Sequence, residues 1–124
     1  MTDISSIVNL DNHPITVSEE YLEKCKNSLR NNSILQLNNF LLPDSLKKIQ
    51  NESHILHSKA YYCSQNHTVL LTKKDHKVGN LDPCNIEVIS DKGCVPHDLI
   101  PESSDLNKLY QSKHFKFFLK NVFG

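Results

Sequence analysis

Net charge, arginine and glycine are all scarce in this 124-residue chain, and each scarcity excludes a class of function. Lysine plus arginine and aspartate plus glutamate both number 14, so there is no net charge and no long basic run to follow phosphates. Arg30 is the only arginine, which leaves one candidate for bidentate binding of an anion. With three glycines and no GxGxxG or P-loop motif, nucleotides and nucleic acids are poor candidates as partners.

Long apolar runs are missing as well. No window approaches the ~18 apolar residues that a membrane-spanning helix needs, and the first ten residues do not read as a secretory signal. The four cysteines form no CxxC pair, so we expect reduced thiols. These are Cys25, Cys63, Cys84 and Cys94. The sequence therefore predicts a cytoplasmic protein without a membrane partner.

The first half of the chain predicts helix, strand and helix. Thr16 and Glu19 form a capping box ahead of an apolar stripe at every fourth residue, which is typical of a helix N-terminus. Pro43 suits the first position of a second helix. The predicted elements are an extended lead-in at 1–15, a helix at about 18–31, a strand at 34–38 and a helix at about 43–60.

The second half predicts two strands and two more helices. Phe115, Phe118, Leu119 and Val122 recur at i, i+3, i+4 and i+7, the spacing of one helix stripe. The predicted elements are strands at 67–71 and 86–89 joined by a polar loop at 72–84, a turn at 91–93, a short helix capped at 103–105 and running through 110, and a final helix at 112–122. Together these patterns predict an α+β fold in which 16–124 form a single region.

Phe117 does not belong to the final helical stripe. At ~100° per residue it points nearly opposite to Phe115 and Phe118. Phe117 and Phe123 therefore predict an apolar surface that a protein partner or further chain covers, as in an incomplete domain. The alternative is one exposed phenylalanine, which is common on protein surfaces.

Two sets of side chains have metal-ligand chemistry, and neither makes a complete site. His54 and His57 are three residues apart on the second predicted helix, but a solvated helix face explains both. The second set could gather around a hairpin to bind zinc, yet its spacing fits no standard zinc knuckle. It consists of Cys84, Cys94, His97 and Asp98. We assign no catalytic, cofactor-binding or metal residue, and no His-x-Asp/Glu element of a non-haem iron site occurs.

Two stretches of the chain resemble iron(II)- and 2-oxoglutarate-dependent oxygenases. Residues 31–46, NNSILQLNNFLLPDSL, resemble the entry of that family, where a helix leads to a strand and a "gFL-p-e-L" element starts a long helix outside the double-stranded β-helix barrel. Residues 98–110, DLIPESSDLNKLY, followed by 115–124, resemble the branch of free-amino-acid hydroxylases and radical halogenases.

The resemblance implies an N-terminal portion of such an oxygenase, made of helices and strands that flank an absent barrel core. In the family, Fe(II) and 2-oxoglutarate are held by a His-x-Asp or His-x-Gly element, a distal histidine and an arginine. None of these lies in this chain, so the portion is expected to be inactive, while the parent oxidises a small, amino-acid-like substrate. The alternatives are a stand-alone interaction or ligand-binding module that uses the Phe117 and Phe123 surface, and a small zinc protein built on Cys84, Cys94 and His97.

Overall fold

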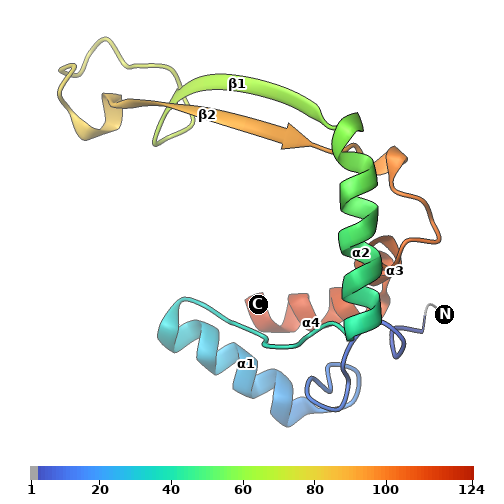
Figure 1. Cartoon of the computed structure of the whole chain (residues 1–124). Helices are drawn as coiled ribbons and strands as arrows, with labels where there is room; N and C mark the ends of the chain where they lie inside the picture. The colour runs from blue at the N-terminus through green and yellow to red at the C-terminus, as the bar shows by residue number, and fades with distance from the viewer. Residues whose placement is uncertain (1–2) are drawn as a thin grey trace. The chain divides into compact units, whose positions relative to one another are not determined.

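A computed structural model describes residues 3–124 and defines a small α+β fold. The elements are α1 (Glu19–Asn32), α2 (Pro43–Leu56), β1 (Tyr61–Thr68), β2 (Glu87–Cys94), α3 (Asp105–Gln111) and α4 (Lys113–Phe123) (Figure 1). Instead of the predicted single region 16–124, the chain divides into two compact units. Unit 1 contains 3–55 and 100–124, and unit 2 contains Leu56–Leu99. Within 3–124, no helix has the length and apolar character needed to cross a membrane.

The N-terminal segment forms the centre of the core of unit 1, so the predicted extended lead-in is wrong for residues 3–15. Ile4, Ile7, Val8 and Ile15 are each at most 2% exposed. The Val8 amide donates to the Ile4 carbonyl at 2.8 Å, which closes a helical turn. Apolar residues at i, i+3 and i+4 meet on one side of such a turn. This spacing buries the segment although the residues between them are polar.

Helix α1 begins one residue later than predicted and has a different cap. The Tyr21 amide donates to the Ser18 hydroxyl at 3.1 Å, so Ser18 is the N-cap and the predicted Thr16–Glu19 capping box is wrong. The Ser18 amide donates to the Pro14 carbonyl at 3.2 Å, so a turn precedes the helix and includes Thr16. The helix itself, predicted at about 18–31, is confirmed.

The strand predicted at 34–38 is wrong. This segment has no ladder partner among the described residues, and Leu35 and Leu37 pack instead against the core of unit 1. A single bridge, Val8 to Leu41, is the strand-like pairing that the structure shows nearby. The alternating apolar residues here therefore pack, partly buried, against the core and do not pair in a sheet, because a strand needs a neighbour as well as a pattern.

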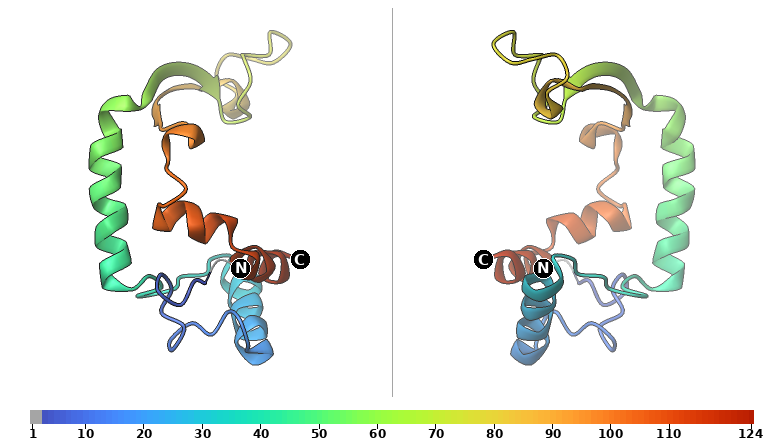
Figure 2. Two further views of the ribbon diagram at one scale, coloured as in Figure 1. Left: turned by 90° about the vertical axis from the view of Figure 1, so that its right-hand side faces the viewer. Right: turned by 90° about the vertical axis from the view of Figure 1, so that its left-hand side faces the viewer.

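Two serines cap the last helices, as serine hydroxyls do at helix starts. Ser104 accepts from the Asn107 amide at 3.3 Å and Ser112 from the Phe115 amide at 3.4 Å. The predicted stripe of α4 is confirmed, since Phe118 and Val122 are buried. Helices α1 and α4 lie side by side in both views of Figure 2.

Helix α2 begins at Pro43 as predicted, and its last predicted turn is a 3-10 helix, His57–Lys59. It is tied to α3 by two hydrogen bonds within unit 1. The buried Ser45 hydroxyl donates to Asp105 Oδ2 at 3.0 Å, and the Ser104 hydroxyl donates to Glu52 Oε1 at 2.7 Å. Asp105 also lies 3.8 Å from the ammonium of Lys48 and 3.8 Å from that of Lys108.

Unit 2 is a two-stranded antiparallel hairpin with a long loop. The register runs from Tyr61 opposite Cys94 to Thr68 opposite Glu87. Strand β1 thus ends where the strand predicted at 67–71 begins, because Leu71 adopts a left-handed backbone (φ 59°) and turns the chain. The turn predicted at 91–93 is also wrong, since these residues belong to β2.

A close contact between the Tyr62 ring and Gly93 explains why β2 contains a glycine. The Tyr62 ring lies over Gly93, where a Cβ atom would come within 2.7 Å of Tyr62 Cε1. The ring covers the backbone that the missing side chain leaves open, as aromatic residues do opposite strand glycines. The glycine that predicted a turn therefore makes room for a cross-strand aromatic contact.

Candidate functional site

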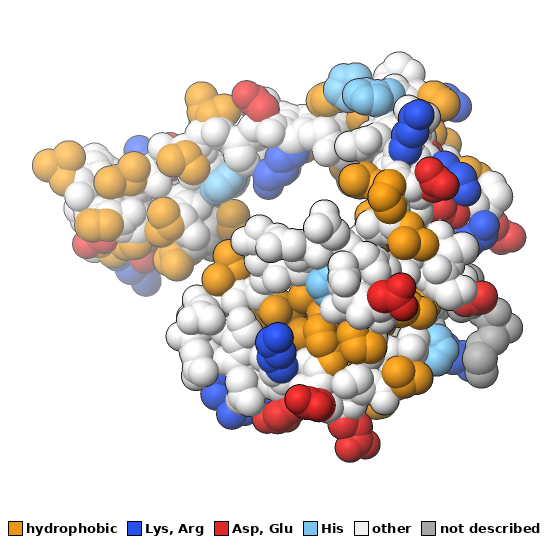
Figure 3. Space-filling model, turned by 60° about the horizontal axis from the view of Figure 1, so that its bottom comes forward, with side chains coloured by type: hydrophobic (Ala, Val, Ile, Leu, Met, Phe, Trp, Pro, Cys, Tyr) orange, Lys and Arg blue, Asp and Glu red, His pale blue; other side chains and the backbone are white. Residues whose placement is uncertain are grey.

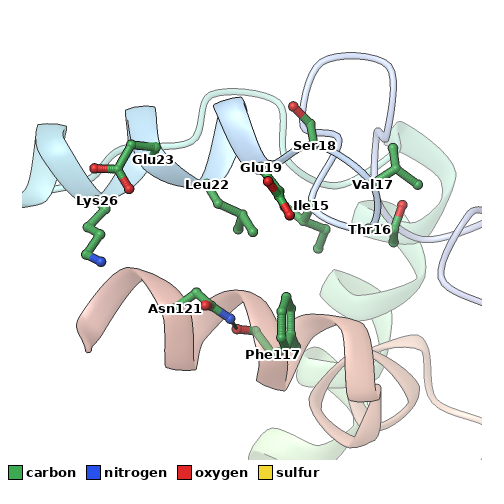
Figure 4. A pocket seen from close by; sticks show the side chains of 10 residues that line it. All are labelled: Ile15, Thr16, Val17, Ser18, Glu19, Leu22, Glu23, Lys26, Phe117 and Asn121. Atoms are coloured by element: carbon green, nitrogen blue, oxygen red, sulfur yellow. Dashed lines mark hydrogen bonds between the residues drawn. The ribbon is translucent and has the colours of Figure 1, made fainter.

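A groove between α1 and α4 is the hollow in unit 1 that includes Phe117. It has a volume of about 400 Å³ and combines an apolar floor with two carboxylates and one ammonium group. Its lining is Ile15, Thr16, Val17, Ser18, Glu19, Leu22, Glu23, Lys26, Phe117 and Asn121. Figure 4 shows Phe117 pointing from α4 toward α1, with Leu22 on the facing helix. A groove of this kind can hold an apolar side chain and place polar groups beside it.

The predicted position of Phe117 is confirmed, while the partner remains a prediction. Phe117 is 57% exposed, whereas its neighbour Phe118 is 2% exposed. Phe123 is exposed as well, at 72%. The amide nitrogen of Asn121 donates to the Phe117 carbonyl at 2.8 Å, so this side chain is already engaged with its own helix. The groove therefore offers mainly Phe117, Leu22 and the rim charges to a ligand.

The histidine pair predicted from i, i+3 spacing does not share a helix. Helix α2 ends at Leu56, so His57 lies in the following 3-10 turn and His54 in the helix. The Tyr62 hydroxyl lies 3.1 Å from His57 Nδ1, and the two rings meet edge-on at 5.9 Å. His57 thus has a structural partner in the hairpin, and it lies outside the α-helix on which the i, i+3 argument depended.

The second candidate metal set is separated by the length of a strand. Cys84 precedes β2 and Cys94 ends it, and eight strand residues span about 25 Å. His97 and Asp98 follow in a 3-10 turn beyond the same end. Within 3–124 no three His, Cys, Asp or Glu side chains lie close enough to hold one metal ion. The hairpin turn expected to gather these residues is part of β2, so the set is not brought together.

Cys84 has a local partner of its own. A hydrogen bond to the Asp82 carboxylate raises the pKa of the Cys84 thiol, and the same contact lowers the pKa of Asp82. The Asp82 carboxylate also accepts from the Cys84 amide at 3.0 Å, which caps the 3-10 turn Pro83–Asn85. The raised pKa lowers the thiolate fraction of Cys84 and does not activate it as a nucleophile.

A serine and a histidine meet across the hairpin, a contact that the sequence did not predict. His67 Nε2 lies 2.8 Å from the Ser90 hydroxyl, and Nδ1 lies 2.9 Å from the Thr68 carbonyl oxygen. Because a carbonyl only accepts, Nδ1 carries the proton and Nε2 accepts from Ser90. This is the geometry of a base beside a hydroxyl, but acyl transfer also needs donors placed for the oxyanion, and a serine–histidine contact alone does not supply them. We interpret the pair as a cross-strand tie.

A buried histidine joins three segments of unit 1, and the sequence did not single it out either. His13 Nε2 lies 2.7 Å from the Asn38 carbonyl oxygen and therefore donates, so Nδ1 accepts from the Tyr21 hydroxyl at 2.6 Å. Burial, and to a lesser extent contact with Cys25, raises the pKa of Tyr21. In the sequence, His13 stands between apolar residues and the start of a helix. This position does not predict its hydrogen-bond partners.

Comparison with known proteins identifies no relative of this chain. No protein-family model, curated protein or solved structure matches the chain.

Proposed function

We propose that residues 3–124 are the non-catalytic α+β portion of an iron(II)- and 2-oxoglutarate-dependent oxygenase-like protein. In this proposal the portion supports a catalytic barrel encoded elsewhere, and the parent protein hydroxylates or halogenates a small, amino-acid-like substrate. Fe(II) and 2-oxoglutarate would bind to the barrel, since the chain has no His-x-Asp/Glu element and no arginine after Arg30.

The observation that supports this proposal is the position of the two resembling stretches. The FLLPDSL stretch reaches α2 with Pro43 at its first residue, as the family's long outer helix would begin. The IPESSDLNKLY stretch reaches α3 with Ser104 as its N-cap, and α4 follows after Ser112. Both stretches thus coincide with helix starts, and local capping chemistry accounts for each start.

The coding sequence after Gly124 gives the first test. We expect a His-x-Asp or His-x-Gly element, followed by a distal histidine and an arginine. Anaerobic titration with Fe(II) and 2-oxoglutarate gives the second: the longer protein should develop a ferrous charge-transfer absorption, and residues 1–124 alone should not. Oxygen consumption by the 124-residue chain with 2-oxoglutarate would refute the assignment of the catalytic residues to the barrel.

The α1–α4 groove favours a second candidate, an interaction module that binds an apolar segment over Phe117. Phe117 and Phe123 are both more than half exposed, and Glu19, Glu23 and Lys26 would orient a charged partner beside them. Heat denaturation with light scattering separates the two candidates. An independent module should unfold in one sharp transition and stay dispersed, whereas a portion that needs its barrel should unfold broadly or aggregate.

A further inference from the structure

The hairpin of unit 2 has one strand edge without the usual protection against pairing. Strand edges in natural proteins carry charged residues, above all lysine, which oppose the addition of another strand. Strand β2 follows this rule with Glu87, Asp91 and Lys92. Strand β1, YYCSQNHT, has no charged residue and no proline over eight positions. The two edges therefore differ, and β1 is the one open to a further strand.

The hydrogen bonds at the end of β1 show which of its amides point outward. The Thr68 amide donates to the Thr72 carbonyl at 3.0 Å and not to Glu87, its register partner in β2, so we take this amide to point away from β2. Amide directions alternate along an antiparallel strand, so the amides of Asn66, Ser64 and Tyr62 also point away from β2. No third strand pairs with them within 3–124. Since the Thr72 contact occupies the end of the strand, the free run extends from Tyr61 to His67 and is centred on Ser64.

We infer that β1 pairs in antiparallel fashion with β1 of a second copy of this chain, about a two-fold axis at Ser64. Ser64 then lies opposite Ser64 of the other copy, and Tyr62 lies opposite Asn66, with outward-pointing amides at each of these positions. Tyr61 lies opposite His67 in the same register. Because β1 is uncharged, this pairing opposes no like charges, which is the electrostatic condition that self-association of an edge must meet.

Dimerisation stabilises the hairpin by adding strands to its sheet. A two-stranded sheet is marginal in water, and three or more strands are needed for independent stability. Pairing through β1 gives a four-stranded sheet in the order β2–β1–β1–β2, with the charged β2 edges outside. Such a two-fold contact is closed, since each copy uses the same edge once. The charged outer edges stop further growth into a fibre. This inference does not depend on the oxygenase assignment.

The test is the oligomeric state of the 124-residue chain by sedimentation velocity over a concentration series. We expect a monomer–dimer equilibrium for the natural chain and for Ser64→Gln, which changes the side chain without adding charge. Ser64→Lys places two ammonium groups opposite each other and should raise the dimer dissociation constant at least about tenfold. Added salt should partly restore this dimer. Ile89→Lys adds the same charge on β2, at a residue that is 70% exposed, and should leave dimerisation unchanged.

Hydrogen exchange provides a second readout at the level of single amides. The amides of Tyr62, Ser64 and Asn66 should become protected as the concentration rises through the dimer range, while those of the β1–β2 ladder should change little. A chain that stays monomeric at every concentration would overturn the inference. An open-ended polymer would also overturn it, as would equal loss of the dimer in Ile89→Lys and Ser64→Lys.

Discussion

The Tyr21 hydroxyl donates a 2.6 Å hydrogen bond to His13 Nδ1, and the opposite nitrogen of that ring donates to the Asn38 carbonyl at 2.7 Å. His13 is 8% exposed, so both partners would be left unsatisfied if the imidazole were removed. We expect His13→Leu to lower the free energy of unfolding by about 2–4 kcal/mol in urea titrations. Tyr21→Phe, which removes one of the two bonds, should cost about 1 kcal/mol. His54→Leu, on an exposed helix position, should change stability by less than about 0.5 kcal/mol, and equal losses in His13→Leu and His54→Leu would contradict the role of the buried ring.

Tyr21 should make stability fall at alkaline pH. Burial raises its pKa in the fold, above the ordinary phenol value of about 10. Above that ordinary value the unfolded chain loses a proton that the folded chain keeps, so stability is full below it and is lost as the pH rises toward the folded pKa. Urea midpoints measured across this range should decline less in Tyr21→Phe than in the natural chain. Identical slopes in the two proteins would show that Tyr21 does not cause the decline.

Cys84 should alkylate slowly for as long as Asp82 is ionised. The hydrogen bond to the carboxylate raises the thiol pKa, which lowers the thiolate fraction at mildly alkaline pH. Asp82→Asn keeps an acceptor for the Cys84 amide but removes the charge, so iodoacetamide should modify Cys84 faster in this variant. Mass spectrometry can follow Cys94 in the same sample as an internal reference, and its rate should not change. A slower or unchanged reaction at Cys84 would contradict the proposed cause.

Two glycines of unit 2 provide a matched pair of alanine substitutions that tests the contact between Tyr62 and Gly93. A Cβ atom at Gly93 would lie 2.7 Å from Tyr62 Cε1, whereas one at Gly79 would meet nothing within 4 Å. Gly93→Ala must displace the Tyr62 ring and should destabilise the hairpin by about 1 kcal/mol. Gly79→Ala should be neutral or slightly stabilising. Hydrogen exchange in the β1–β2 ladder can measure both, and Tyr62→Ala combined with Gly93→Ala should show no further loss from the clash.

Truncation of two neighbouring phenylalanines of α4 should cost very different amounts of stability. Phe118 is 2% exposed and lies in the core of unit 1, so Phe118→Ala should cost about 3–5 kcal/mol. Phe117 is 57% exposed, so Phe117→Ala should cost less than about 1 kcal/mol. Thermal unfolding followed by circular dichroism can compare the two. Similar losses would mean that Phe117 is covered in solution.

The helices could be predicted from the sequence because their signals are local. Serine hydroxyls, Pro43 and the spacing of Phe118 and Val122 act within one or two turns, and they define α2, α3 and α4 in the structure. Strand β1 could not be located in this way. Its residues are mostly polar, and its bounds follow from pairing with β2, which no local window contains.

The candidate sites also divide into features that the local sequence predicts and contacts that it does not. The position of Phe117 off the buried stripe follows from helical geometry alone and is confirmed. The contacts of His13 with Tyr21 and of His67 with Ser90 depend on tertiary packing and on strand register, so no sequence motif predicts them. The candidate zinc ligands are not brought together for a related reason: a turn was expected where β2 continues, and the strand holds Cys84 and Cys94 apart.

The core of unit 1 joins the first residues of the chain to the last helix, with unit 2 inserted between them. During synthesis, Ile4 and Val8 therefore leave the ribosome long before Phe118 and Val122 exist to cover them. The nascent chain must carry uncovered apolar side chains through most of translation, a condition that favours aggregation. Slow codons placed before α4 should consequently lower the yield of folded protein more than the same codons placed within it.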